Sequence, residues 1–212
     1  MKKSLLLILA ALLIISAFIF VSGQSNLKQP MPTPGTSIPD TNEAKEIMRT
    51  IERAYDIQAE AAQSFDLKKF PTVFINDPRF SVSSSRLKMI KEVTNNPSLE
   101  TAGYLDYKMA YSTWRNEGIL RREALQKKAK AENRDLTREE SLSLLDSKGR
   151  MVPARVNGPI KTHPLEFISI TINDDTATTI LDDGVAAFEM NLVLVDGKWY
   201  IAGVGKTFSI HP

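Results

Sequence analysis

From residue 40 to residue 65, apolar side chains recur every three or four positions, which is the spacing of one face of a helix. Asp40 is suited to cap the start of this helix, and Glu43 stands where a capping box places its acid. The pattern predicts a long amphipathic helix whose apolar face carries Ala44, Ile47, Met48, Ile51, Tyr55, Ala62 and Phe65.

Further helices are predicted between residues 84 and 145. Residues 84–94 and 103–133 have helix-forming composition, and a capping box at Thr137 opens a short helix that reaches about Leu145. Before them, residues 72–75 and 79–83 are rich in β-branched and aromatic residues around a turn, and predict a short pair of strands.

The C-terminal residues change to strict alternation of apolar and polar positions. Alternating segments at 168–172, 177–181 and 188–194 are separated by acidic turns, and Asp196-Gly197 is a strong hairpin signal before a last strand from Trp199. Helices first and a four-strand meander last predict an α+β fold, with long N-terminal helices packed on a curved antiparallel sheet.

The N-terminal residues have a separate role. Residues 5–23 carry no charge and come just after Lys2, Lys3 and Ser4. The run approaches the about 20 residues that cross a bilayer core, and small residues before Gln24 also fit signal peptidase cleavage. We expect residues 1–23 to be a signal peptide or a transmembrane anchor. The remainder is then expected outside the cytoplasm, at the cell membrane or secreted if the leader is cleaved.

Residues 24–40 contain four prolines together with Gly and Ser, and are expected to form an extended tether. Residues 41–212 then make one domain of ordinary size.

The charge balance excludes a general attraction to nucleic acid. The 27 basic residues include Lys2 and Lys3, so 25 remain to face 25 acidic residues in the rest of the chain. There is no cysteine, which excludes disulfides, thiol nucleophiles and Cys-based metal sites.

Three passages resemble the nuclear-transport-factor-2-like superfamily, a cone-shaped fold that also includes ketosteroid isomerases and polyketide cyclases. They are Ile51-Glu52-Arg53-Ala54-Tyr55 in the first helix, the passage from Asp66-Leu67-Lys68-Lys69-Phe70 to Val73-Phe74-Ile75-Asn76-Asp77, and the final hairpin from Leu192 to Ile201. Residues 84–160 are longer than the family usually needs, so we expect a helical insertion there. The resemblance implies the fold, and the fold alone implies no single function.

An aromatic stripe follows the longest helix. Tyr104, Tyr107, Tyr111 and Trp114 are spaced three or four apart and share one face. They are expected either to pack on the sheet as core, or to line a pocket for an apolar or sugar ligand.

Residues 115–134 hold seven basic residues against three acidic ones. A solvated helix face is one interpretation, with Glu123 supporting Lys127 one turn later. The other is contact with an anionic surface such as lipid headgroups, through Arg121, Arg122, Lys127 and Lys128.

No standard catalytic set is present. His163 and His211 have no motif partner nearby, and no phosphate-binding loop, nucleophile elbow or His-Glu metal helix occurs. Two pairs of acids stand at expected turns, where Asp is favoured for backbone reasons: Asp174-Asp175 and Asp182-Asp183. We therefore expect neither a metal nor a cofactor.

These observations favour a binding module that meets an envelope component, a partner protein or a small apolar ligand. The alternative is an enzyme of the isomerase or cyclase type. The family resemblance implies that such an enzyme moves a proton with an acid inside the cone. Asp77 and Asp106 are the acids considered for that position, and neither matches a catalytic position of the family.

Overall fold

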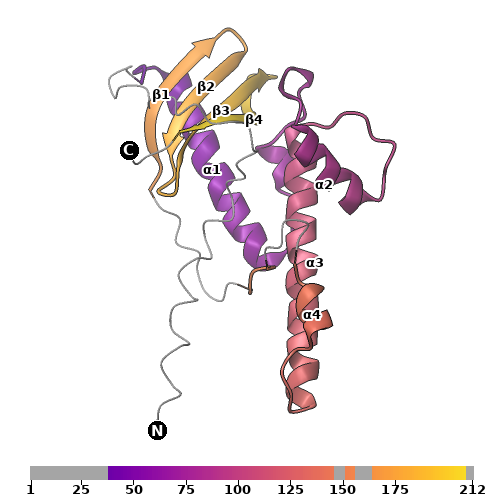
Figure 1. Ribbon diagram of the computed structural model, residues 1–212. Coiled ribbons are helices and arrows are strands. Elements are labelled where there is room, and N and C mark those ends of the chain that lie inside the picture. The colour runs from indigo at the N-terminus through magenta and orange to yellow at the C-terminus, as the bar shows by residue number, and fades with distance from the viewer. Residues whose placement is uncertain (1–37, 146–150, 156–163, 209–212) are drawn as a thin grey trace.

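The computed structural model describes residues 38–145, 151–155 and 164–208, and Figure 1 shows their arrangement. Within these residues, four α-helices precede a four-stranded antiparallel sheet whose strands lie in chain order. The predicted α+β class with a C-terminal meander is confirmed.

Helix α1 (Asn42–Ser64) begins at a side-chain cap and ends at a left-handed residue. The hydroxyl of Thr41 accepts a hydrogen bond from the Ala44 N–H at 3.1 Å. Asp40 forms an ion pair with Lys45 instead. The expected cap at Asp40 is therefore wrong by one residue, because Thr and Asp both cap well and only the register of the first turn selects between them.

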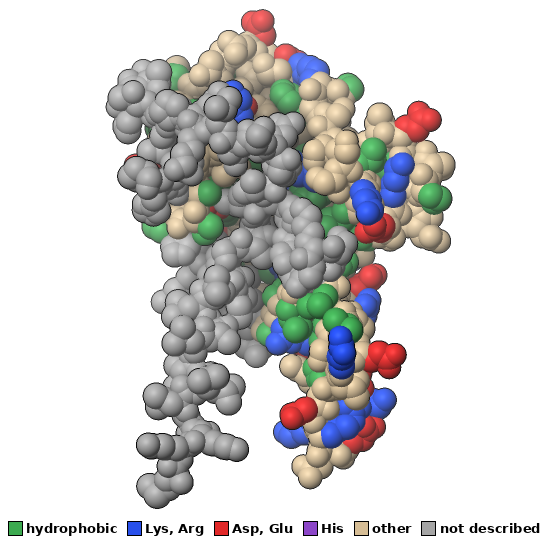
Figure 2. Space-filling view, viewed as in Figure 1, with side chains coloured by type: hydrophobic (Ala, Val, Ile, Leu, Met, Phe, Trp, Pro, Cys, Tyr) green, Lys and Arg blue, Asp and Glu red, His purple; other side chains and the backbone are tan. Residues whose placement is uncertain are grey.

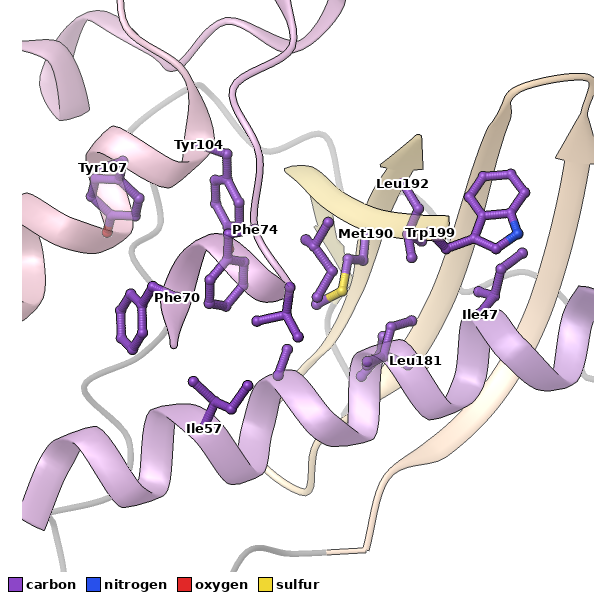
Figure 3. Packing of buried hydrophobic residues seen from close by; sticks show 14 of the residues in the cluster. Ile47, Ile57, Phe70, Phe74, Tyr104, Tyr107, Leu181, Met190, Leu192 and Trp199 are labelled. Atoms are coloured by element: carbon purple, nitrogen blue, oxygen red, sulfur yellow. The ribbon is translucent and has the colours of Figure 1, made fainter. Parts of the chain in front are cut away.

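The apolar face of α1 packs across the sheet (Figure 1). Ile47 on α1 lies close to Trp199 and Leu181 of the sheet, as Figure 3 shows, and all three side chains are almost fully buried. Each such side chain contributes about 1.5–3 kcal/mol when it leaves water. This contact joins the first predicted element to the last.

The sheet is a meander of strands joined by tight turns. Asp174 and Asp196 have positive φ, as does Gly197, so the hairpin signal at Asp196-Gly197 is confirmed. The register shifts once between the first two strands and twice between the last two, and such bulges bend and twist a sheet. The strands are β1 (Glu166–Asn173), β2 (Thr176–Asp182), β3 (Ala187–Val195) and β4 (Lys198–Phe208).

The expected strands at residues 72–75 and 79–83 are wrong. Two 3₁₀ helices occupy this region, Phe70–Thr72 and Pro78–Phe80, and each has a proline at its start. Proline fixes φ near −65° and favours the first turn of a helix, which outweighs the β-branched composition here. One bridge remains, in which Phe74 pairs in parallel with Ile201 of β4.

Two further helices pack together beside β4. They are α2 (Ser84–Thr94) and α3 (Tyr104–Ala131), and both match the predicted segments. The start of α3 is capped from elsewhere in the chain, because the amide oxygen of Asn76 accepts a hydrogen bond from the Asp106 N–H at 3.1 Å. The Asp106 carboxylate in turn accepts from the Gly103 N–H at 3.2 Å.

The C-terminal part of α3 projects away from the sheet, and the short helix α4 (Arg138–Leu142) lies against it (Figure 1). Thr137 and Glu140 form the predicted capping box. Ile119, Leu144 and Val152 are buried here but stand outside the main hydrophobic core. The expected insertion at residues 84–160 thus includes a projecting arm with a small core of its own. This arm consists of α3 from about residue 118, α4 and residues 151–155.

The expected leader at 1–23 and most of the expected tether at 24–40 lie outside the described residues. None of the helices that the structure describes combines the length and hydrophobicity required of a membrane span.

Candidate functional site

Six aromatic rings form a continuous row from the first 3₁₀ helix to the middle of α3. Neighbouring ring centroids lie between 5.5 and 6.1 Å apart, in tilted or edge-on arrangements. These separations are typical of favourable aromatic pairs. Figure 3 shows the first four members beside the core. The row consists of Phe70, Phe74, Tyr104, Tyr107, Tyr111 and Trp114.

The predicted aromatic stripe of α3 makes up the last four rings of this row. Tyr104, Tyr107 and Tyr111 are at most 8% exposed and belong to the main core, while Trp114 is half-buried at its edge. The one-face prediction is confirmed by the successive ring contacts. Burial supports the core interpretation for the three tyrosines.

A lysine lies against this row on the side that faces α1. The Nζ of Lys108 lies 5.3 Å from the ring centroids of both Phe74 and Tyr104. It donates a hydrogen bond to the Oε1 of Gln58 on α1. The Nε2 of Gln58 donates to the Ala54 carbonyl at 3.1 Å, which holds the amide oxygen toward the lysine.

An arginine of α2 completes the group. The guanidinium carbon of Arg86 lies 4.8 Å from the ring centroid of Tyr107. Among the described residues, no carboxylate forms an ion pair with Arg86. We call Arg86, Tyr104, Tyr107 and Lys108 the cation–tyrosine cluster; its members come from two helices and meet because α2 packs on α3.

The environment of Lys108 favours the neutral amine. Burial is the main cause, and the positive charge of Arg86 adds to it, so that the pKa of Lys108 falls from 10.5 to about 7. The residue as a whole keeps some exposed surface, while protein atoms surround its ammonium group closely enough for desolvation to dominate. Burial likewise raises the pKa of Tyr104 above its usual range.

A hollow of about 210 Å³ borders the cluster, and Arg86 and Tyr104 form part of its wall. No Asp or Glu of the described residues lines it. Asn191 of β3 also lines the hollow. The Oδ1 of Asn191 accepts a hydrogen bond from the Thr178 hydroxyl at 3.3 Å, which leaves the amide N–H groups to donate to other acceptors. The described residues that line it are Arg79, Phe80, Ser81, Val82, Arg86, Tyr104, Asn191, Gly203 and Val204.

The two arginines of the hollow differ in their partners. Arg79 is held by Asp77 at 2.9 Å and by Asp175 at 2.9 Å, and these carboxylates, Asp77 first, raise its pKa. Its charge is therefore balanced within the protein. Arg86 lies in the same wall, and no carboxylate of the described residues forms an ion pair with it.

The expected anionic-surface residues are partly occupied by the protein itself. Arg121 donates to the Ser143 carbonyl at 3.3 Å, and Arg122 to the Val152 carbonyl at 2.7 Å. Lys128 lies 4.0 Å from the Glu140 carboxylate. On the face shown in Figure 2, basic and acidic side chains alternate along the projecting arm.

The expected pair of Glu123 with Lys127 is replaced by a longer-range contact. Glu123 accepts two hydrogen bonds from Arg155, at 2.7 and 3.0 Å, because the chain returns alongside α3 after α4. Together with Arg121 and Arg122, this pair fastens Ser143, Val152 and Arg155 to α3. Much of the basic stretch therefore has a structural role.

The acids considered for catalysis or turns bind backbone or arginine. Asp77 caps the second 3₁₀ helix through the Arg79 N–H, and Asp106 closes the first turn of α3. Asp182 and Asp183 accept from backbone N–H groups of their own turn. Asp183 also accepts from the Tyr55 hydroxyl at 3.3 Å.

No group of His, Asp or Glu within the described part of the chain could hold a metal ion. His163 and His211 lie outside that part.

The cation–tyrosine cluster was missed by sequence reasoning. Arg86 and Lys108 carry no motif, and each resembles an ordinary solvated helix residue in the sequence. One signal was present: Lys108 follows Tyr104 by one helical turn, so it shares the flank of the aromatic stripe. Its burial depends on α1 and on Phe74, which are distant in the sequence.

Comparison with known proteins gives no relative: no family model, no curated protein and no solved structure matches this chain.

Proposed function

We propose that the protein is a binding module, tethered at the membrane outside the cytoplasm, that takes the anionic group of a small ligand in the hollow beside Arg86. One observation carries the proposal. Arg86 lines a hollow whose described lining holds no acidic residue, and it forms no ion pair with a described carboxylate.

The chemistry of the wall suits a carboxylate. A guanidinium presents its donors in a planar fork that matches the two oxygens of a carboxylate. The amide N–H groups of Asn191 supply further donors, because its Oδ1 is already occupied by Thr178. A ring lies against Arg86 on one side, at Tyr107, which keeps the guanidinium in place.

The volume restricts the ligand to a small one. Pockets for drug-sized ligands occupy about 300–1,000 Å³, and the hollow beside Arg86 holds about 210 Å³. A ligand of a few heavy atoms, or one end of a longer ligand, fits this volume.

The location part of the proposal is supported by the sequence. The uncharged run at residues 5–23 behind two lysines favours membrane insertion with the C-terminal part outside. The nuclear-transport-factor-2-like fold is also proposed, supported by the three passages that resemble it and by the order of helices and meander.

The location is tested by cell fractionation with protease treatment of intact cells or spheroplasts. We expect the full-length chain in the membrane fraction, or a shortened chain in the medium, with the domain accessible to protease. Full-length protein in the cytosolic fraction and protected from protease would refute the location.

The binding site is tested with the full-length chain in detergent and a panel of small carboxylates, using titration calorimetry. We expect Arg86→Met to weaken binding at least tenfold, and Arg49→Met, an exposed arginine of α1, to leave it unchanged. Binding that is equal in both variants and in the parent would contradict the assignment of Arg86.

A further inference from the structure

The projecting arm carries apolar side chains on its surface. Of the four large hydrophobic residues that are exposed in the described part of the chain, three belong to the arm. Leu120 is 50% exposed, Leu142 54% and Met151 50%. Figure 2 shows apolar side chains gathered over α4. We call Leu120, Leu142 and Met151 the arm patch.

Contacts within the arm bring these three residues to the same part of it. Met151 forms an antiparallel bridge with Leu145, three residues after Leu142. Arg121, which follows Leu120 on α3, donates a hydrogen bond at 3.3 Å to the carbonyl next to Leu142. The patch therefore combines α3, α4 and the chain that returns after α4.

Several cations of the arm have no carboxylate partner among the described residues. Arg121 and Arg122 donate to backbone carbonyls, so both guanidinium groups are held by neutral acceptors. Lys127 is exposed and lies two turns after Leu120 on the same side of α3, and Lys130, also exposed, follows one turn later. These charges are available to an anionic partner beside the patch.

The arm is also the basic part of the described chain. Residues 118–145 and 151–155 carry eight basic and five acidic side chains, and three of these acids are paired with Arg134 or Arg155. The described residues outside the arm carry thirteen basic and nineteen acidic side chains. Near a negatively charged surface, this distribution turns the arm toward the surface and the rest of the domain away from it.

We propose that the arm patch docks on the anionic surface of the membrane to which the leader attaches the chain. Leu120, Leu142 and Met151 enter the boundary between headgroups and acyl chains, and the neighbouring cations contact lipid phosphates. A membrane fits better than a second copy of the chain, because a two-fold contact through the patch would bring the unbalanced cations of both copies together.

The docking rests on the membrane location proposed above, and the expected tether makes it geometrically possible. Residues 24–40 span at most about 60 Å when fully extended. A patch that is tied so close to the bilayer meets it at a high effective concentration, so that individually weak contacts are sufficient.

The test places a polarity-sensitive fluorophore on the patch of the full-length chain. The sequence contains no cysteine, so Leu120→Cys and Leu142→Cys can each be labelled at one position only. The labelled chains are inserted into nanodiscs of phosphatidylcholine, with or without phosphatidylglycerol as the anionic lipid. We expect blue-shifted emission in the anionic discs, and no shift for Val185→Cys, an exposed apolar position outside the arm.

Charge variants test the contribution of the lipid phosphates. Lys127→Gln combined with Lys130→Gln should lower the ratio of docked to undocked label, by about fivefold for each lysine that lies at the surface. Lys88→Gln combined with Lys206→Gln removes the same charge from exposed positions outside the arm, and should leave this ratio unchanged.

The possible results separate the docking from the location. Chains that enter both kinds of disc without a shift at either patch position refute the docking and leave the location intact. Chains that enter neither kind of disc refute the location and the docking with it. A shift of equal size in neutral discs refutes the role of the charges. A shift already present in detergent that fades on dilution shows that a second copy covers the patch, and this overturns the proposal.

Discussion

Single residues in this protein take their properties from elements that are distant in the sequence. Lys108 is one example, since α1, α2 and Phe74 together set its ionisation. The start of α3 is another, because its cap comes from Asn76, well before the helix in the chain. Both situations lead to measurable effects of single substitutions.

Stability should depend on pH through Lys108. Its pKa in the folded chain is about 7, below the ordinary value of 10.5, so between these pH values the unfolded chain binds more protons. The free energy of unfolding therefore rises as pH increases across this window. In Lys108→Met this part of the rise should be absent, as measured by Tm between about pH 6 and 10.

The matched control is Lys88→Met, at an exposed position. It should keep the parent's dependence of Tm on pH. Equal slopes for the parent and Lys108→Met would show that the lysine titrates as it does in water.

Gly103 and Asn76 should be energetically coupled. A Cβ at residue 103 would overlap the Asn76 side chain, which caps α3. Gly103→Ala should cost about 1–3 kcal/mol through this crowding, and Asn76→Ala about 0.5–2 kcal/mol through the lost cap. Urea denaturation of both single variants and the double variant measures the coupling.

In the double variant the overlap with the amide group of Asn76 is removed together with the cap, while the Cβ at residue 76 still crowds the added methyl group. Its loss should therefore be clearly smaller than the sum of the single losses. Additive losses would mean that the backbone near Gly103 absorbs the added methyl group.

At the scale of elements, the projecting arm is held mainly by polar contacts. Arg122 binds the Val152 carbonyl, and Arg134 binds Glu140 at 2.7 and 2.9 Å. Its few apolar contacts include Val152 against Gly118, where a Cβ would come within 2.7 Å of the valine. As pH falls, an element held in this way should open before the main core unfolds.

The Glu140 carboxylate should control the opening of α4. Hydrogen bonds from Arg134 and then from the Thr137 N–H lower its pKa from 4.5 to about 2. This stabilisation is fully present above pH 4.5 and is lost as pH falls toward 2. Glu140→Gln should speed amide hydrogen exchange in residues 138–142 severalfold at neutral pH, with a smaller difference near pH 3.

Glu139→Gln, at an exposed neighbour on the same helix, is the control and should leave exchange unchanged. If Glu140→Gln exchanges like the parent at neutral pH, the ion pair with Arg134 contributes nothing to the arm.

At the scale of the whole molecule, the main core and the arm are separable. The main core draws buried residues from α1, the first part of α3 and the sheet, and none from the described residues between 118 and 155. The cation–tyrosine cluster lies entirely on the core side of this division. The site and the arm therefore need not depend on each other.

Replacing residues 118–155 by a short Gly-Ser linker should leave a folded domain. We expect cooperative thermal unfolding and a near-UV circular dichroism signal from the aromatic side chains of the main core, as in the parent. A shortened chain without a cooperative transition would show that the arm contributes to the main core.

Periodicity alone was enough to predict the helices at residues 84–94 and 103–133 and the meander, because local spacing decides which face of an element is apolar. It was not enough at residues 72–83, where two prolines outweighed a strand-like composition. The aromatic stripe was correctly placed on one face, yet whether it faced ligand or core depended on what packed against it.

The sequence by itself determined the order of elements and the hairpin turns, since each depends on neighbours within a few residues. Only the tertiary structure decided which charges are left unbalanced. Arg79 meets Asp175 across the fold and is neutralised, while Arg86 lies over the ring of Tyr107 and forms no ion pair with a described carboxylate. The reason is physical: the ionisation of a side chain depends on the water and charges around it in space, and these come from segments that local spacing does not relate.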